Sequence, residues 1–135
     1  MKLDYNFMKE ILIVMQEYDS HEIENLKLLD LLNITNENED KFIGHIKILG
    51  DNNFIECNNT AYPYGIFTDN RLNGYKIISA KYRLTAQGYE FLDVLKKDNI
   101  FHQIADLAVP TAFKVGTQIL TQTIWEKIKN GILAY

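Results

Sequence analysis

Cysteine and long apolar runs are scarce in this sequence of 135 residues, and each scarcity excludes a class of protein. Cys57 is the only cysteine, so an internal disulfide and a zinc site built from cysteines are both excluded. The longest apolar-rich region, residues 104–124, is interrupted by polar and charged residues, and it cannot span a membrane. The amino-terminal residues predict an amphipathic helix instead of the apolar core of a signal peptide. We therefore expect a cytoplasmic protein without a membrane segment.

Recognisable catalytic motifs are missing from the sequence as well. The histidine at position 21 is followed by Glu22, but the second histidine of an HExxH zinc-protease helix is absent because Asn25 stands in its place. The sequence contains no phosphate-binding loop, no GxGxxG turn and no nucleophile elbow. The remaining histidines, His45 and His102, fall in separate predicted elements. We expect no enzyme activity, no metal and no cofactor.

The net charge of −4 is unevenly distributed along the chain. Residues 1–60 contain 5 lysines and 12 acidic residues, which gives this part a balance of −7. Residues 61–84 contain only Asp69 as an acid, and their basic residues are Arg71, Lys76, Lys81 and Arg83. Because opposite charges attract, a surface for an anionic partner is expected in this second segment.

Apolar residues at helical spacing predict three helices before residue 51. The first is expected over residues 4–18 with Asp4 as its N-cap, and the second over residues 23–32. The third is expected to begin after Asn36 and to end at Gly50, because glycine is common just after the last helical residue. The chain therefore begins with a predicted three-helix segment.

The third predicted helix has an apolar side and a polar side. The apolar side, which we expect to be buried, contains Phe42, Ile43, Ile46 and Leu49. The opposite side contains Glu37, Asp40, Lys41, Gly44, Lys47, Ile48 and Asp51. His45 lies at the edge of the apolar side, where half-buried packing explains it better than a role as a ligand or a base. This amphipathic pattern predicts a helix with one exposed face.

Two segments rich in β-forming residues follow, at residues 54–57 and 75–84. The long connection between them contains a third candidate strand at residues 62–67, and the whole segment is a predicted β-wing. Its tyrosines are suited either to stack on nucleobases or to cover the small sheet, and covering the sheet is the favoured interpretation. A further helix begins after the second segment, with Thr85 as its cap and with Gly88 allowing close backbone packing.

The carboxyl-terminal part of the chain is predicted to be helical. A short helix is expected at residues 100–108, and Pro110 suits the first turn of a last helix that reaches Asn130. This last helix is apolar over more than half of its circumference, and one of its stripes contains Phe113, Leu120, Ile124 and Ile128. We expect this stripe to form a homodimer interface, and packing of the whole helix within one subunit is the alternative. Residues 1–98 are therefore expected to be one domain, and residues 99–135 a dimerising helical extension.

The predicted order of elements is helix, helix, helix, strand, wing, strand and helix, which is the order of a winged helix-turn-helix domain. The sequence also resembles an uncharacterised bacterial and prophage winged-helix family of unknown function that includes relatives of YjcQ. The resemblance covers residues 1–98, and three stretches carry it. They read MKLD at residues 1–4 with KEIL at 9–12, IGHIKIL at 43–49 with NFIE at 53–56, and RLTAQGYEFLD at 83–93. The expected fold is mainly α (α+β), a winged helix-turn-helix domain with a C-terminal helical extension.

This resemblance implies a DNA-binding transcriptional regulator of the phage or prophage type, with double-stranded DNA as its partner. The residues expected to bind DNA are Lys41, Gly44, His45, Lys47 and Ile48 in the third helix, and Arg71, Lys76 and Lys81 in the wing. Because acidic residues lie close to these cations, binding is expected to be modest and strongly dependent on salt. The alternative is a protein-interaction module, a phage accessory protein that modulates a host protein through the third helix and the wing.

Overall fold

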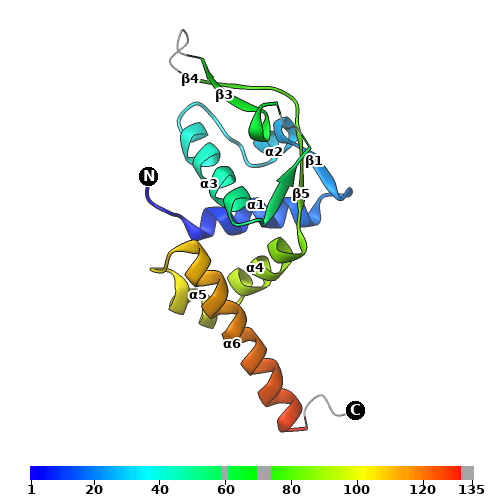
Figure 1. Cartoon of the computed structure of the whole chain (residues 1–135), viewed down its shortest axis with the longest axis vertical. Helices are drawn as coiled ribbons and strands as arrows, with labels where there is room; N and C mark the ends of the chain where they lie inside the picture. The colour runs from blue at the N-terminus through cyan, green and yellow to red at the C-terminus, as the bar shows by residue number, and fades with distance from the viewer. Residues whose placement is uncertain (59–60, 70–73, 132–135) are drawn as a thin grey trace. The chain divides into compact units, whose positions relative to one another are not determined.

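A mixed α+β architecture, mostly helical with small antiparallel sheets, is seen in the computed structural model of the chain (Figure 1). The structure describes residues 1–58, 61–69 and 74–131. The chain divides into two compact units, Met1–Tyr89 and Glu90–Tyr135. The mainly helical α+β class expected from the sequence is confirmed. A division of the chain into separate domains after residue 98 stays a prediction.

The first unit contains three helices, α1 (Tyr5–Glu17), α2 (Asn25–Leu31) and α3 (Glu39–Asp51). Asp4 caps α1 as predicted, because its side chain accepts a hydrogen bond from the backbone N–H of Phe7. The fully buried residues of α1 are Met8, Ile11 and Leu12. The apolar side predicted for α3 is also confirmed, since Phe42, Ile43, Ile46 and Leu49 are at most 2% exposed.

The second helix is shorter than predicted because a strand takes its first residues. Strand β1 comprises Glu22–Glu24, and α2 begins at Asn25 instead of at Ile23. Ile23 lies in the middle of this strand and is buried, whereas the glutamates on either side of it are more exposed. A single apolar residue between polar neighbours fits the period of a strand as well as the start of a helix. The strand forms because these residues pair with residues 81–83, which lie far along the chain.

The predicted end of α3 at Gly50 is wrong, since the helix continues to Asp51. The left-handed residue that follows the helix is Asn53, whose φ is 60°; asparagine tolerates this conformation better than most residues. Gly50 has a different role, because a Cβ at this position would overlap the hydroxyl of Tyr64. The glycine therefore lets a tyrosine approach the helix backbone.

A three-stranded antiparallel sheet has the strand order β1-β5-β2, in which β2 is Ile55–Cys57 and β5 is Lys81–Leu84. The buried residues Tyr82 and Leu84 alternate along β5 with exposed Lys81 and Arg83. One face of the sheet therefore contributes to the core, and the other face is charged.

A β-hairpin connects β2 to β5, and its strands are β3 (Ile66–Asp69) and β4 (Gly74–Ile77). A single 3₁₀ turn, η1 (Pro63–Gly65), precedes β3. The segment predicted as one long strand at residues 75–84 is thus divided between β4 and β5. Strand β4 belongs to the two-stranded sheet, and β5 belongs to the three-stranded sheet.

The side chain of Asn25 joins this hairpin to the first turn of α2. Asn25 is fully buried, and its Nδ2 donates hydrogen bonds to the carbonyls of Ile78 (2.7 Å) and Tyr64 (3.3 Å). Its Oδ1 accepts a hydrogen bond of 3.2 Å from the backbone N–H of Ala80. The segments that enter and leave the hairpin are therefore both held by one amide group.

The junction between β5 and α4 (Ala86–Lys96) agrees with the prediction. The Thr85 hydroxyl accepts a hydrogen bond of 3.0 Å from the Gly88 backbone N–H, and it donates one to the Asn53 carbonyl. A Cβ at Gly88 would overlap the carbonyl oxygen of Phe54, which as backbone has no freedom to move aside. The predicted cap and the predicted close approach are both confirmed.

The second unit contains α5 (Asp98–Ile104) and α6 (Val109–Lys129), and Pro110 lies in the first turn of α6 as predicted. The rings of Phe91 and Phe113 meet edge to face with their centroids 6.1 Å apart. The apolar side chains of α6 become exposed near its end, and these are Ile124, Trp125 and Ile128. Within the described residues, no helix is long and apolar enough to cross a membrane.

Candidate nucleic-acid interface

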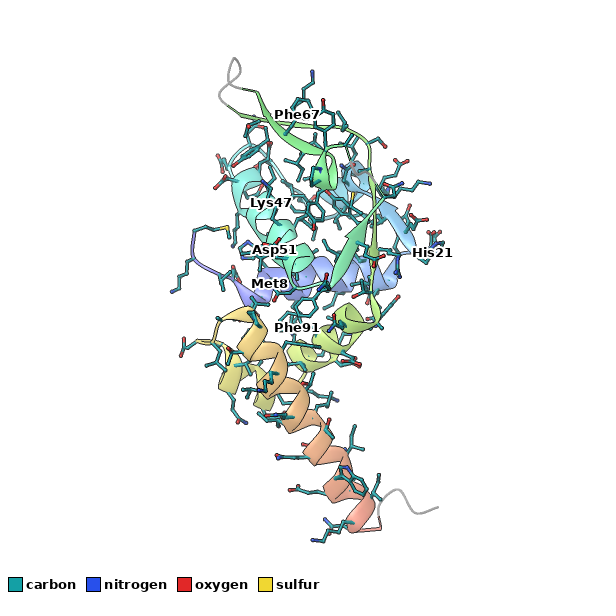
Figure 2. All side chains as sticks on the ribbon, viewed as in Figure 1. Met8, His21, Lys47, Asp51, Phe67 and Phe91 are labelled. Carbon is teal, nitrogen blue, oxygen red and sulfur yellow. The ribbon has the colours of Figure 1, made fainter. Side chains whose placement is uncertain are left out.

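The outward face of α3, which we define by Asp40, Gly44, Lys47, Ile48 and Asp51, is the candidate interface. Asp40, Lys47 and Asp51 are exposed, while Gly44 and Ile48 are half-buried. Figure 2 labels Lys47 in the middle of α3 and Asp51 near its end. Lys47 forms no ion pair with any residue that the structure describes. The face therefore carries one available cation between two carboxylates.

Lys41 does not take part in this face as a free cation. Its ammonium lies 2.7 Å from Oδ2 of Asp4, and it sits 5.0 Å from the centre of the Phe7 ring. The hydrogen bond from Lys41 holds the pKa of Asp4 below its usual value. Lys41 thus connects α3 to the start of α1, and Asp4 compensates the charge predicted to face DNA.

His45 is fully buried, so its side chain is not available to a DNA partner and the prediction that included it is wrong on this point. Its Nε2 accepts a hydrogen bond of 2.9 Å from the backbone N–H of Asp4. Its Nδ1 lies 2.7 Å from the Lys41 carbonyl, which only an N–H can satisfy. The neutral ring with its proton on Nδ1 meets both partners. Burial lowers the pKa of His45, which favours the same neutral form.

Met1 lies over Gly44 at the centre of the outward face. A Cβ at Gly44 would overlap the Met1 sulfur, yet Met1 is 66% exposed. The contact is therefore made by the end of a flexible side chain that solvent largely surrounds. This cover was not foreseen, because no local sequence signal relates residue 1 to residue 44.

The wing cations fall on different surfaces. Lys76 is exposed on β4 and pairs with Phe67 across the hairpin. Tyr75, the preceding residue, points the other way and donates a hydrogen bond of 2.5 Å to Oδ1 of Asp40 on α3. This hydrogen bond raises the pKa of Tyr75. Arg71 lies outside the residues that the structure describes, so only Lys76 is placed on the hairpin.

Lys81 lies on the charged face of the three-stranded sheet and not on the hairpin. It is paired in register with Glu24 of β1. The neighbouring Arg83 forms an ion pair of 2.8 Å with Glu56 of β2 and is also in register with Glu22. The three acids outnumber the two cations among these residues, so this face is poorly suited to phosphate.

Two aromatic features lie at the surface. Tyr62 was considered among the wing tyrosines, but neither its ring pair with half-buried Phe67 nor the exposure of Trp125 was foreseen from the sequence. Tyr62 and Phe67 form a ring pair at the hairpin, with their centroids 4.7 Å apart, and Tyr62 is 44% exposed. Trp125 is 66% exposed near the end of α6. The wing tyrosines were expected to cover the sheet, which is true of buried Tyr82 but not of Tyr62. In the described part of the chain, no cluster of three or more His, Cys, Asp or Glu side chains could hold a metal.

These features define a small α+β protein with an exposed helix beside a β-hairpin. The chain belongs to the DUF2513 family of hypothetical proteins, whose sequence profile matches residues 2–114. No curated protein and no solved structure matches the chain. The expectation of an uncharacterised family is confirmed, but the relationship to YjcQ is not part of the match. Most of α6, from residue 115 onward, lies beyond the matched residues.

We expect the free energy of unfolding to fall as the pH decreases below 6.5, the ordinary pKa of histidine, because burial lowers the pKa of His45 in the folded protein. Between the two pKa values the unfolded chain binds more protons, so acidification favours unfolding. Urea titrations at about pH 7.5 and about pH 5.5 measure this loss.

The matched controls are His45→Gln and His102→Gln, since His102 is exposed. His45→Gln should be less stable at neutral pH but should lose less stability on acidification than the wild-type protein. His102→Gln should behave as the wild-type protein does. An undiminished acid-dependent loss in His45→Gln would contradict the assignment.

Proposed function

We propose that this protein is a winged helix-turn-helix protein that binds double-stranded DNA and regulates transcription in phages or prophages. The observation that carries the proposal is the sheet order β1-β5-β2 with α3 inserted before β2 and a hairpin before β5. In a winged helix this topology places the third helix and the hairpin where a duplex can meet both. A distant relationship to the relatives of YjcQ is part of the same proposal.

In the proposed complex, α3 enters the major groove. Lys47 is exposed and long enough to reach a phosphate or the acceptor atoms of guanine. Ile48, one residue further, would contact the methyl group of thymine. Met1 would be displaced from Gly44, because Met1 is 66% exposed and touches the glycine through the flexible end of its side chain. The hairpin would bring Lys76 to the backbone of the same duplex.

Charge limits the strength of this binding. Asp40 and Asp51 flank Lys47 on α3, and Lys41 is compensated by Asp4. Each phosphate that the protein neutralises makes the slope of log K against log salt more negative by about 0.9. With few available cations per chain, we expect modest affinity and a shallow salt slope, in place of the strong salt dependence expected from the sequence, because Lys41 is paired with Asp4. A dimer would double the number of contacts.

The protein-interaction alternative is favoured by one observation, the mixed character of the outward face of α3. An exposed thioether, a half-buried isoleucine and two carboxylates suit a protein partner better than a polyanion. Under this alternative the same face would bind a host protein and would not bind DNA. The test of the proposal therefore also decides between these two functions.

Lys47→Ala should weaken binding to the duplex fragment that the protein prefers by about tenfold, since a base-edge contact contributes on the order of 1–3 kcal/mol. Gel retardation with fragments surrounding the gene, at two salt concentrations, measures the effect. Lys129→Ala removes one exposed cation from the part of α6 outside the family match, and it should leave binding unchanged. Absence of duplex binding at low salt would reject the DNA function in favour of the protein-interaction function.

We also propose that the protein is a homodimer through the end of α6. Of the four residues predicted to form the interface, Ile124 and Ile128 are 47% and 48% exposed, whereas Phe113 and Leu120 are half-buried within the second unit. Trp125 adds exposed apolar area beside them. An exposed apolar surface of this kind is most stable when a second copy covers it.

Light scattering of the full chain should report two copies, and the double change Ile124→Glu with Ile128→Glu should give one copy. The matched control is Gln118→Glu with Gln122→Glu, which adds the same charge to exposed positions of the same helix and should stay dimeric. A wild-type monomer, or a dimer that survives the first double change, would refute the proposal.

A further inference from the structure

The face of the β3–β4 hairpin that points away from α3 carries an aromatic pair and a cation, which we call the Tyr62 platform. It consists of Tyr62, Phe67 and Lys76. The two rings are 4.7 Å apart and inclined at 32°, so they lie closer to stacked than to perpendicular. Figure 2 places Phe67 on the hairpin, beyond the start of α3.

The register of the hairpin separates the platform from the core. Ile66 pairs with Ile77 and Thr68 pairs with Tyr75, and the hydroxyl of Tyr75 reaches α3. Because side chains alternate along a strand, the intervening pair of Phe67 and Lys76 points to the opposite side. The aromatic pair is therefore on the side of the hairpin opposite to Tyr75, whose hydroxyl makes the contact with α3.

The platform is held in position from its base. The Gly65 backbone N–H donates a hydrogen bond of 2.7 Å to the Tyr62 carbonyl, closing η1 beneath the ring. Two residues further on, the Tyr64 carbonyl accepts a hydrogen bond from the buried amide of Asn25. Tyr62 is nevertheless 44% exposed, so a hydrogen-bonded turn presents an accessible ring. A fixed aromatic ring loses little conformational entropy when a ligand stacks on it.

We propose that the Tyr62 platform binds an unpaired nucleobase of single-stranded DNA. A base would stack on the exposed ring of Tyr62, and the ammonium of Lys76 would bind an adjacent phosphate. Stacking on aromatic side chains beside a cation is the general way in which proteins hold single strands without sequence preference. Tyr62 and Phe67 are not part of the outward face of α3, and the single strand is not the duplex proposed for that face; Lys76 alone is shared between the two proposals.

The experiment is fluorescence anisotropy of a labelled oligothymidine of roughly a dozen nucleotides with the full-length protein at low salt. Tyr62→Ala should weaken binding by roughly tenfold or more, and Tyr62→Phe should bind as the wild type does because it keeps the ring. Tyr62→Leu, which keeps apolar area without an aromatic face, should bind as weakly as Tyr62→Ala. Lys76→Ala should reduce the dependence of binding on salt.

Tyr89→Ala is the matched control, because Tyr89 on α4 is also 44% exposed. It should leave binding unchanged. Wild-type binding by Tyr62→Leu, an equal loss in Tyr89→Ala, or no binding of the oligothymidine at low salt would each overturn the proposal. These outcomes are separate from the duplex test, which depends on Lys47: retained duplex binding with lost strand binding would leave the proposed function intact.

Discussion

One buried amide, that of Asn25, fixes where the β3–β4 hairpin lies relative to the helices of the first unit. A buried polar group is stable only when its hydrogen bonds are made, and this side chain makes them to backbone on both sides of the hairpin. Aspartate has nearly the same shape but would offer no N–H to the carbonyls of Tyr64 and Ile78. The outward face of α3 and the Tyr62 platform keep a defined relation because of this constraint.

The turn that Asn25 secures is itself strained. Tyr64 has a φ of 64° and Gly65 a φ of 69°, and the left-handed conformation costs a residue with a Cβ roughly 1–2 kcal/mol. Four contacts offset this cost. The Tyr64 carbonyl accepts hydrogen bonds from Asn25 and from the Tyr82 hydroxyl, its ring meets that of Tyr82 edge to face, and its hydroxyl fits against Gly50 of α3. The strained turn thus joins the sheet, the hairpin and α3.

Local signals in the sequence predicted what local interactions determine. The caps at Asp4 and Thr85 each bond an N–H three residues further on, and the apolar side of α3 follows from residues three and four positions apart; all were confirmed. The close approach at Gly88 was confirmed as well, although the backbone that it meets, at Phe54, lies far along the chain. Strand β1 was missed because the partner with which it pairs, β5, lies far along the chain. The site was predicted less well for the same reason: burial of His45 and compensation of Lys41 both come from the start of α1, some forty positions away in the chain.

The most direct test of the role of Asn25 is amide hydrogen exchange in Asn25→Ala. The Ile78 N–H, bonded to the Gly65 carbonyl at the base of the hairpin, should exchange roughly tenfold faster or more, because two carbonyls and two N–H groups lose the Asn25 side chain as a partner. Amides in the middle of α1, such as that of Ile11, should lose less protection than Ile78 does. Equal losses at the two sites, or no loss at Ile78, would contradict the claim that this amide positions the hairpin.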